Sequence, residues 1–186
     1  MKKILVWLEV LPFFYACEKS NFTDEVLAES KANGIKKQSI KMQVTRPLKV
    51  HFAATPNTAL PAVQCLPEQY GQVYLPGGGW ISGNATHVGL VDSANSAYVL
   101  QSCAFGPLQG EVTTIYTGTI TAANGDAYYY TGSIVTAFAD GAMQGTITIN
   151  GGTGRFTNAT GTLALNGYAD FQTGAATWTG EGTIKF

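Results

Sequence analysis

The sequence predicts an all-β fold, a single antiparallel eight-stranded β-barrel, with a β-sandwich as the alternative. From Pro47 onward, short runs rich in Val, Ile, Thr, Tyr and Phe are separated by glycines, and 21 of the 22 glycines lie after residue 50. The runs are evenly spaced, and no convincing helical period occurs among them. Apolar and polar residues alternate within several runs, as they do in a sheet with one face against a core.

The boundaries of the runs predict about eight strands, the last range being a hairpin of two. We expect them near residues 48–54, 72–82, 85–92, 96–104, 111–122, 127–139, 142–149 and 161–185. Two tight turns are explicit in the sequence. Asn124-Gly125 lies between a Thr/Ile-rich and a Tyr-rich run, which is a strong hairpin signal, and the segment Asp170 to Gly174 separates the last two runs.

Alternation along the strands assigns the two faces of the sheet. Trp178, Ile184 and Phe186 share one face of the last run, and the opposite face carries threonines with Glu181 and Lys185. We expect the aromatic face to point inward. Threonine would then cover the outside of the barrel, which explains why only 12% of the residues are charged.

The front of the chain differs from the rest and predicts three regions: a signal peptide at 1–16, a lipidated Cys17 with a flexible tether at 17–46, and the β-barrel domain at 47–186. Two lysines precede an apolar stretch from Ile4 to Ala16, which is the anatomy of a signal peptide. The segment Phe14-Tyr15-Ala16-Cys17 resembles a loose lipobox of bacterial lipoproteins. The resemblance implies lipidation of Cys17, export, and a membrane anchor at the outer membrane or cell surface. A plain secretory signal, or an ordinary helix with a buried cysteine, is the alternative.

Three cysteines are an odd number for an exported protein. If Cys17 carries lipid, Cys65 and Cys103 remain as a candidate disulfide in an oxidising compartment. Two separate buried thiols are the alternative interpretation.

Charge and histidine content argue against several classes of function. Residues 1–50 carry a net charge of +4, whereas residues 51–186 carry −5 with only two cations, so we expect no nucleic-acid partner. His51 and His87 are far apart and lack a carboxylate cluster, so we expect no metal site and no cofactor. His87 falls in a predicted strand, where a structural role is more common than catalysis, and we assign no catalytic residue.

The segment Gly151-Gly152-Thr153-Gly154-Arg155-Phe156, with Ala159-Thr160-Gly161 and a Gly-rich terminal hairpin, resembles the corresponding stretch of allene oxide cyclase-like and dirigent-like barrels. Residues 83–89 and 121–126 also resemble recurring segments of uncharacterised secreted bacterial proteins. The resemblance covers residues 47–186 and implies a calycin-like barrel, but it transfers no activity, because no active-site residue of the plant cyclases matches a position here. Physically, the glycines allow close backbone approach, so that Phe156 plugs one end of the barrel with Arg155 covering it.

An eight-stranded barrel is either filled by side chains or holds one small ligand. Candidate residues for lining such a ligand are Trp80, His87, Tyr128, Tyr130, Phe138 and Trp178. The leading hypothesis is a binding module for a small apolar or carbohydrate-like molecule. The alternatives are a cyclase, isomerase or dirigent-like enzyme that uses the cavity, and a structural envelope protein with a filled core. Because the barrel has few ionisable groups, binding ranks above chemistry.

Overall fold

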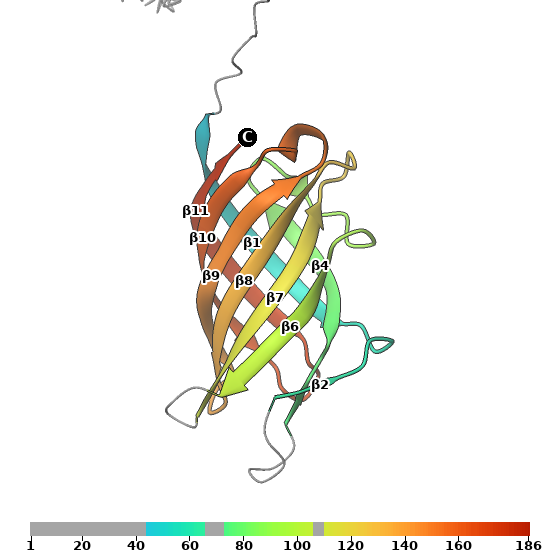
Figure 1. The fold of residues 1–186 in the computed structure, drawn as a ribbon, viewed down its shortest axis with the longest axis vertical. Coiled ribbons are helices and arrows are strands. Elements are labelled where there is room, and N and C mark those ends of the chain that lie inside the picture. Colours follow the sequence, from blue (N-terminus) through green and yellow to red (C-terminus); the bar gives the residue numbers. More distant parts are fainter. Residues whose placement is uncertain (1–43, 66–72, 106–109) are drawn as a thin grey trace, which may run out of the picture. The chain divides into compact units, whose positions relative to one another are not determined.

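The computed structural model describes residues 44–65, 73–105 and 110–186 (Figure 1). The predicted signal peptide, the lipidation site Cys17 and most of the predicted tether lie outside the described residues. The fold below is that of the barrel.

The described residues form eleven strands and one short 3-10 helix. Their bounds are β1 Thr45–Pro56, β2 Val63–Gln64, β3 Tyr74–Leu75, β4 Gly78–Ala85, β5 Gly89–Leu90, β6 Ala97–Phe105, β7 Glu111–Thr121, β8 Ala127–Ala137, β9 Ala142–Gly152, η2 Gly154–Phe156, β10 Thr160–Ala169 and β11 Ala176–Lys185.

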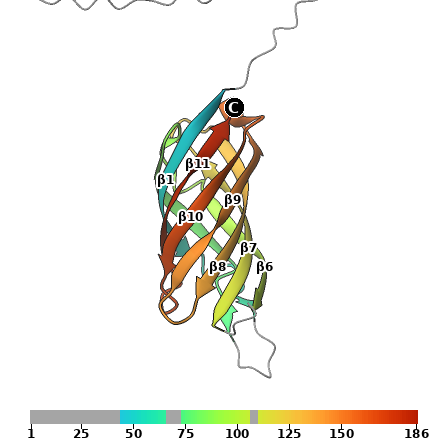
Figure 2. The ribbon, with the colours of Figure 1, turned by 90° about the vertical axis from the view of Figure 1, so that its left-hand side faces the viewer.

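Eight of the strands close into an antiparallel ring, which confirms the predicted fold class. Neighbouring strands follow the order β1-β11-β10-β9-β8-β7-β6-β4, and β4 pairs back with β1 from Val50↔Ala85 to Pro56↔Gly79. Figures 1 and 2 show the tilted strands wrapping around a central lumen. The two-residue strand β5 extends the sheet beside β4, and β2 pairs only with β3.

Both predicted turns and most predicted strands are confirmed, but the strands expected at 72–82 and 85–92 are wrong. The range 72–82 contains two strands, β3 and β4, and β4 continues to Ala85. Residues 86–88 then form a turn, in which His87 has φ of +65°. This left-handed conformation lies far from the extended backbone of a strand, so the chain reverses there and the two-residue strand β5 follows.

The predicted faces of the strands are confirmed. Leu163, Leu165 and Ile184 are buried. Glu181 is exposed on the outside, where its Oε1 lies 2.9 Å from Nζ of Lys49 in an ion pair. Five threonines lie directly opposite one another on the outward side of five adjacent strands: Thr117, Thr131, Thr148, Thr162 and Thr183. Such β-branched pairs stabilise a sheet without charge.

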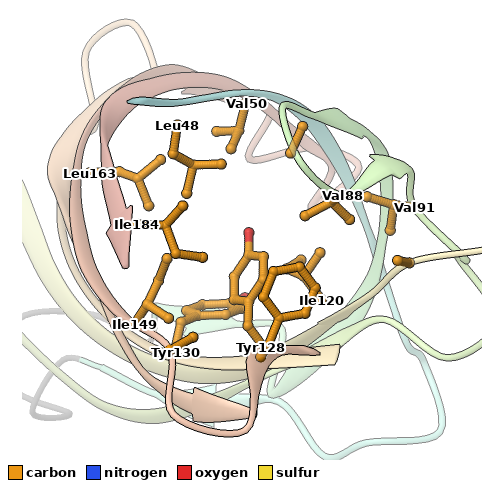
Figure 3. Packing of buried hydrophobic residues seen from close by; sticks show 14 of the residues in the cluster. Leu48, Val50, Val88, Val91, Ile120, Tyr128, Tyr130, Ile149, Leu163 and Ile184 are labelled. Atoms are coloured by element: carbon orange, nitrogen blue, oxygen red, sulfur yellow. The ribbon is translucent and has the colours of Figure 1, made fainter. Parts of the chain in front are cut away.

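One end of the lumen is closed by an aromatic plug, defined as Tyr128, Phe156 and Phe186. Phe156 is fully buried, and its ring lies 5.8 Å from that of Tyr128 and 5.2 Å from that of Phe186. The guanidinium carbon of Arg155 lies 4.8 Å from the centre of the Phe156 ring, and Arg155 also pairs with Asp126 at 3.5 Å. The predicted plug and its arginine cover are therefore confirmed. Figure 3 shows that Leu48, Ile184 and their neighbours fill the lumen from the surrounding strands.

Candidate functional site: a cavity in the lumen of the barrel

The other end of the lumen is hollow. A cavity of about 100 Å³ lies between the last residues of β1, β8 and β10 and the first residues of β7 and β11. Its wall is mainly apolar and includes Ala54, Val112, Ile134, Met143 and Trp178. Tyr74 and Phe171, which are 51% and 43% exposed, stand at its rim, so the cavity meets the solvent there. As far as the described residues show, the barrel is thus plugged at one end and open at the other.

A second void of about 20 Å³ lies deeper in the lumen, between the cavity and the plug. Tyr130, Ile147 and Trp178 border both spaces and form the inner wall of the cavity. Within the described residues the lumen therefore narrows toward the plug, and the cavity is the larger of these two spaces.

Tyrosines are placed in this wall by glycines on the neighbouring strands. Gly79, Tyr98, Gly118 and Tyr130 lie opposite one another across β4, β6, β7 and β8. A Cβ added at Gly118 would lie 2.5 Å from the hydroxyl oxygen of Tyr130, and one added at Gly79 would lie 2.8 Å from that of Tyr98. Each phenol thus extends over a position where the neighbouring strand has no side chain, and the ring lies along the inner wall.

Besides Tyr74 at the rim, three tyrosine phenols line the wall of the cavity, those of Tyr98, Tyr116 and Tyr130. The rings of Tyr98 and Tyr116 meet edge to face, with centroids 5.4 Å apart. Burial raises the pKa of Tyr98 to about 12, with a further contribution from Tyr116. Burial likewise raises the pKa of Tyr116 and of Tyr130. At neutral pH these phenols are uncharged and retain their protons, so they are available as hydrogen-bond donors.

Asp170 is the one charged side chain among the described residues that line the cavity. It belongs to the β10–β11 turn, where its carboxylate accepts hydrogen bonds from the Thr173 hydroxyl at 2.8 Å and the Gln172 amide at 2.8 Å. These bonds lower its pKa, the Thr173 hydroxyl having the largest effect. The carboxylate is thus negatively charged at neutral pH and is already engaged by the turn, which makes it a poor general base.

The structure brings together only part of the predicted set of lining residues. Tyr130 and Trp178 line the cavity, and Tyr128 lines the deeper void and the plug. Phe138 packs against Phe171 at the cavity rim, with ring centroids 5.4 Å apart.

Trp80 and His87, which the sequence predicts as lining residues, do not line this cavity. Trp80 is 43% exposed and borders a shallow depression on the outside of the barrel, because its position in β4 points outward. His87 lies in the turn at the plugged end, where its Nε2 is 3.0 Å from the carbonyl oxygen of Pro47 and its ring packs on Phe186. His87 therefore lies in a turn and not in the strand that the sequence predicts around it.

Sequence reasoning missed Tyr98 and Tyr116, which complete the polar part of the wall. The available signal was the position of each tyrosine opposite a glycine, Gly118 for Tyr98 and Gly132 for Tyr116. That signal requires the strand register, which alternation within one strand does not supply.

A disulfide joins Cys65 and Cys103, with Cα atoms 5.3 Å apart. It links the segment after β2 to β6, next to the cluster that contains Leu75 and Val112. Both of these residues also line the cavity, so the disulfide braces one side of its wall.

Two further observations concern the described ranges only. None of the helices within them has the length and apolar character needed to cross a membrane. No three potential metal ligands from His, Cys, Asp and Glu gather in those ranges.

Comparison with known proteins adds no family and no function to this geometry. No family model and no curated protein matches the sequence. Among solved structures, the chain is similar to a dirigent protein described as a pterocarpan synthase, with a TM-score of 0.40 and 20% identity over 77% of this chain and 90% of that one. A TM-score of this size is too low to carry an argument, so the fold rests on the strand pairings, and the candidate site rests on the residues that line the cavity.

Proposed function

We propose that the barrel is a binding module that holds a small apolar molecule in the cavity at its open end. The observation that supports this most is the cavity itself, a space of about 100 Å³ with a largely apolar wall and an exposed rim. Binding sites for small molecules are concave and mainly apolar, with a few polar groups that fix the orientation of the ligand.

The size of the cavity suits a single ring. An apolar cavity of about 150 Å³ accommodates benzene. A somewhat smaller space that opens at its rim accommodates a single ring, part of which extends toward Tyr74 and Phe171. The apolar wall favours such a molecule over a carbohydrate, whose many hydroxyls would lose their water without gaining partners.

The titratable groups of the cavity favour binding over proton-transfer chemistry. Tyr98, Tyr116 and Tyr130 are weak acids whose pKa values burial raises further, and the pKa of Asp170 is lowered by its turn. A general base works best with a pKa near the pH of the reaction. The shifts move the pKa values of these four groups further from neutral pH.

A substitution that fills the cavity tests the proposal. Ala176 lines the cavity from β11, and the next residue, Thr177, is exposed on the outside. In Ala176→Leu, we expect binding of acetophenone and α-methylstyrene, measured by calorimetry or by quenching of Trp178 fluorescence, to weaken by about tenfold or more. Thr177→Leu adds a leucine to the same strand but leaves the cavity open, so it should bind both probes like the wild type. Failure of the wild type to bind either probe, or equal binding by Ala176→Leu, would contradict the proposal.

We also propose that the protein is exported and anchored to a membrane through lipid on Cys17. The lipobox-like segment before Cys17 supports this, and so does the disulfide between Cys65 and Cys103, because disulfides persist in oxidising compartments. Cys17→Ala should move the protein from the membrane fraction to the soluble fraction after cell disruption. Retention of the variant in the membrane fraction would contradict anchoring by Cys17.

A further inference from the structure

The hydroxyl of Tyr130, in the wall of the cavity, has no hydrogen-bond partner among the described residues. Tyr130 is only 7% exposed, and it borders both the cavity and the deeper void. Its hydroxyl makes no hydrogen bond within the described part of the chain. Every side-chain nitrogen or oxygen that is fully buried in that part has a hydrogen-bond partner. Because the Tyr130 oxygen has none, it is not fully buried and must contact open space. A phenol in this position has a proton to donate and free space in front of it.

A hydroxyl that faces the cavity without a hydrogen bond is a donor that an acceptor on a ligand can satisfy. The glycine at position 118 leaves room for the hydroxyl, because any side chain there would collide with it, and the packing around Tyr130, which is only 7% exposed, holds its ring. The wall therefore holds a donor at a fixed position, which is the arrangement expected of a group that orients a ligand.

The charge of the wall restricts what this donor can meet. Among the described residues that line the cavity there is no cation, and the carboxylate of Asp170 is negatively charged. An anionic ligand would be repelled by Asp170 and would lose its water without gaining a counter-ion. A ligand with an uncharged acceptor is not repelled by Asp170 and needs no counter-ion. The phenols of Tyr98 and Tyr116, close to Tyr130, are uncharged as well.

We propose that the Tyr130 hydroxyl donates a hydrogen bond to an uncharged acceptor, a carbonyl or ether oxygen, on an apolar ring molecule held in the cavity. This inference rests on the proposed binding function and gives it a ligand class: neutral ring compounds with one oxygen acceptor at the inner end. The apolar wall holds the ring, and Tyr130 fixes its orientation.

Two probes of nearly the same shape separate the hydrogen bond from the apolar contacts. Acetophenone carries a carbonyl where α-methylstyrene carries a methylene group. We expect the wild type to bind acetophenone several-fold more tightly than α-methylstyrene. Tyr130→Phe should weaken acetophenone binding by about three- to tenfold, which corresponds to one hydrogen bond, and should change α-methylstyrene binding by less than about twofold. Benzoate, the anionic counterpart, should bind more weakly than acetophenone to the wild type.

Tyr129→Phe is the matched control, since Tyr129 is the next residue in β8 but is 42% exposed on the outside. It removes the same hydroxyl and should change neither affinity. If Tyr130→Phe leaves acetophenone binding unchanged, or weakens both probes equally, the hydrogen bond is overturned. Equal wild-type affinity for the two probes also overturns it, while the proposed binding function remains. If neither probe binds the wild type, both the function and this inference fail.

Discussion

Gly118 and Tyr130 lie opposite each other on β7 and β8, and a methyl group at Gly118 would come 2.5 Å from the Tyr130 hydroxyl oxygen and 2.6 Å from the carbonyl oxygen of Ala97. This pair sets the depth of the cavity, because the tyrosine ring covers the glycine and forms the inner wall. The shape of the site thus depends on a residue that has no side chain.

Gly118→Ala should therefore destabilise the barrel and disturb the cavity. We expect a loss of about 1–3 kcal/mol in the free energy of unfolding, as for overpacking, measured by urea denaturation. In a double-mutant cycle with Tyr130→Leu, the loss caused by Gly118→Ala should be smaller, since the hydroxyl end is absent. Strictly additive losses would show that the two residues do not meet.

The plug should contribute much of the stability of the closed end. Phe156→Ala removes a fully buried ring and should lower the free energy of unfolding by about 3–5 kcal/mol. Phe171→Ala removes a ring that is 43% exposed at the cavity rim, and it should cost less than half as much. Comparable losses for the two variants, from thermal or urea unfolding, would contradict the plug.

The disulfide should stabilise the fold mainly by restricting the unfolded chain. Its sequence separation of 38 residues predicts a contribution of about 4 kcal/mol. Reductant should lower the melting temperature of the wild type but leave that of a Cys65→Ser/Cys103→Ser double variant unchanged. A wild type that resists this shift, with both thiols shown by mass spectrometry to be free, would refute the predicted contribution.

Alkaline pH should destabilise the barrel through its buried phenols. The pKa of Tyr98 is about 12 in the folded protein and about 10 in an unfolded chain. The unfolded state therefore loses the proton first, and stability that is fully present below pH 10 is lost as the pH rises toward 12. Tyr98→Phe should show a smaller decrease than the wild type in urea denaturation between pH 9 and pH 11.5. A parallel decrease in the two proteins would contradict the shift.

Low pH should remove the stability that the Asp170 carboxylate contributes to the folded state. Its pKa is lowered in the folded state by hydrogen bonds from Thr173 and Gln172, so the stability it contributes is present above the unfolded pKa of about 4 and is lost as the pH falls through the folded pKa. The difference in unfolding free energy between wild type and Asp170→Asn should narrow from pH 6 to pH 3. A difference that stays constant or widens would contradict this assignment.

The sequence was sufficient to predict most of the strands, both hairpin turns, the inward faces and the plug, because these follow from local alternation and turn chemistry; the ranges 72–82 and 85–92 were wrong. Tyr128 and Tyr130 were placed inside by their two-residue spacing alone. His87 was misplaced because its turn depends on a positive φ at a non-glycine residue, which no local pattern announces. Tyr98 and Tyr116 were missed because their role depends on which residue faces them on the next strand, and register is a property of the assembled sheet.

The ring closes between strands from opposite ends of the barrel sequence. Lys49 of β1 and Glu181 of β11 are 132 residues apart, and β1 also pairs with β4. Such distant contacts make folding slow, because a large loop must close before the pairing stabilises the chain. Since β11 follows every other strand of the ring in the sequence, the ring stays open until β11 has been made and can pair with both β1 and β10.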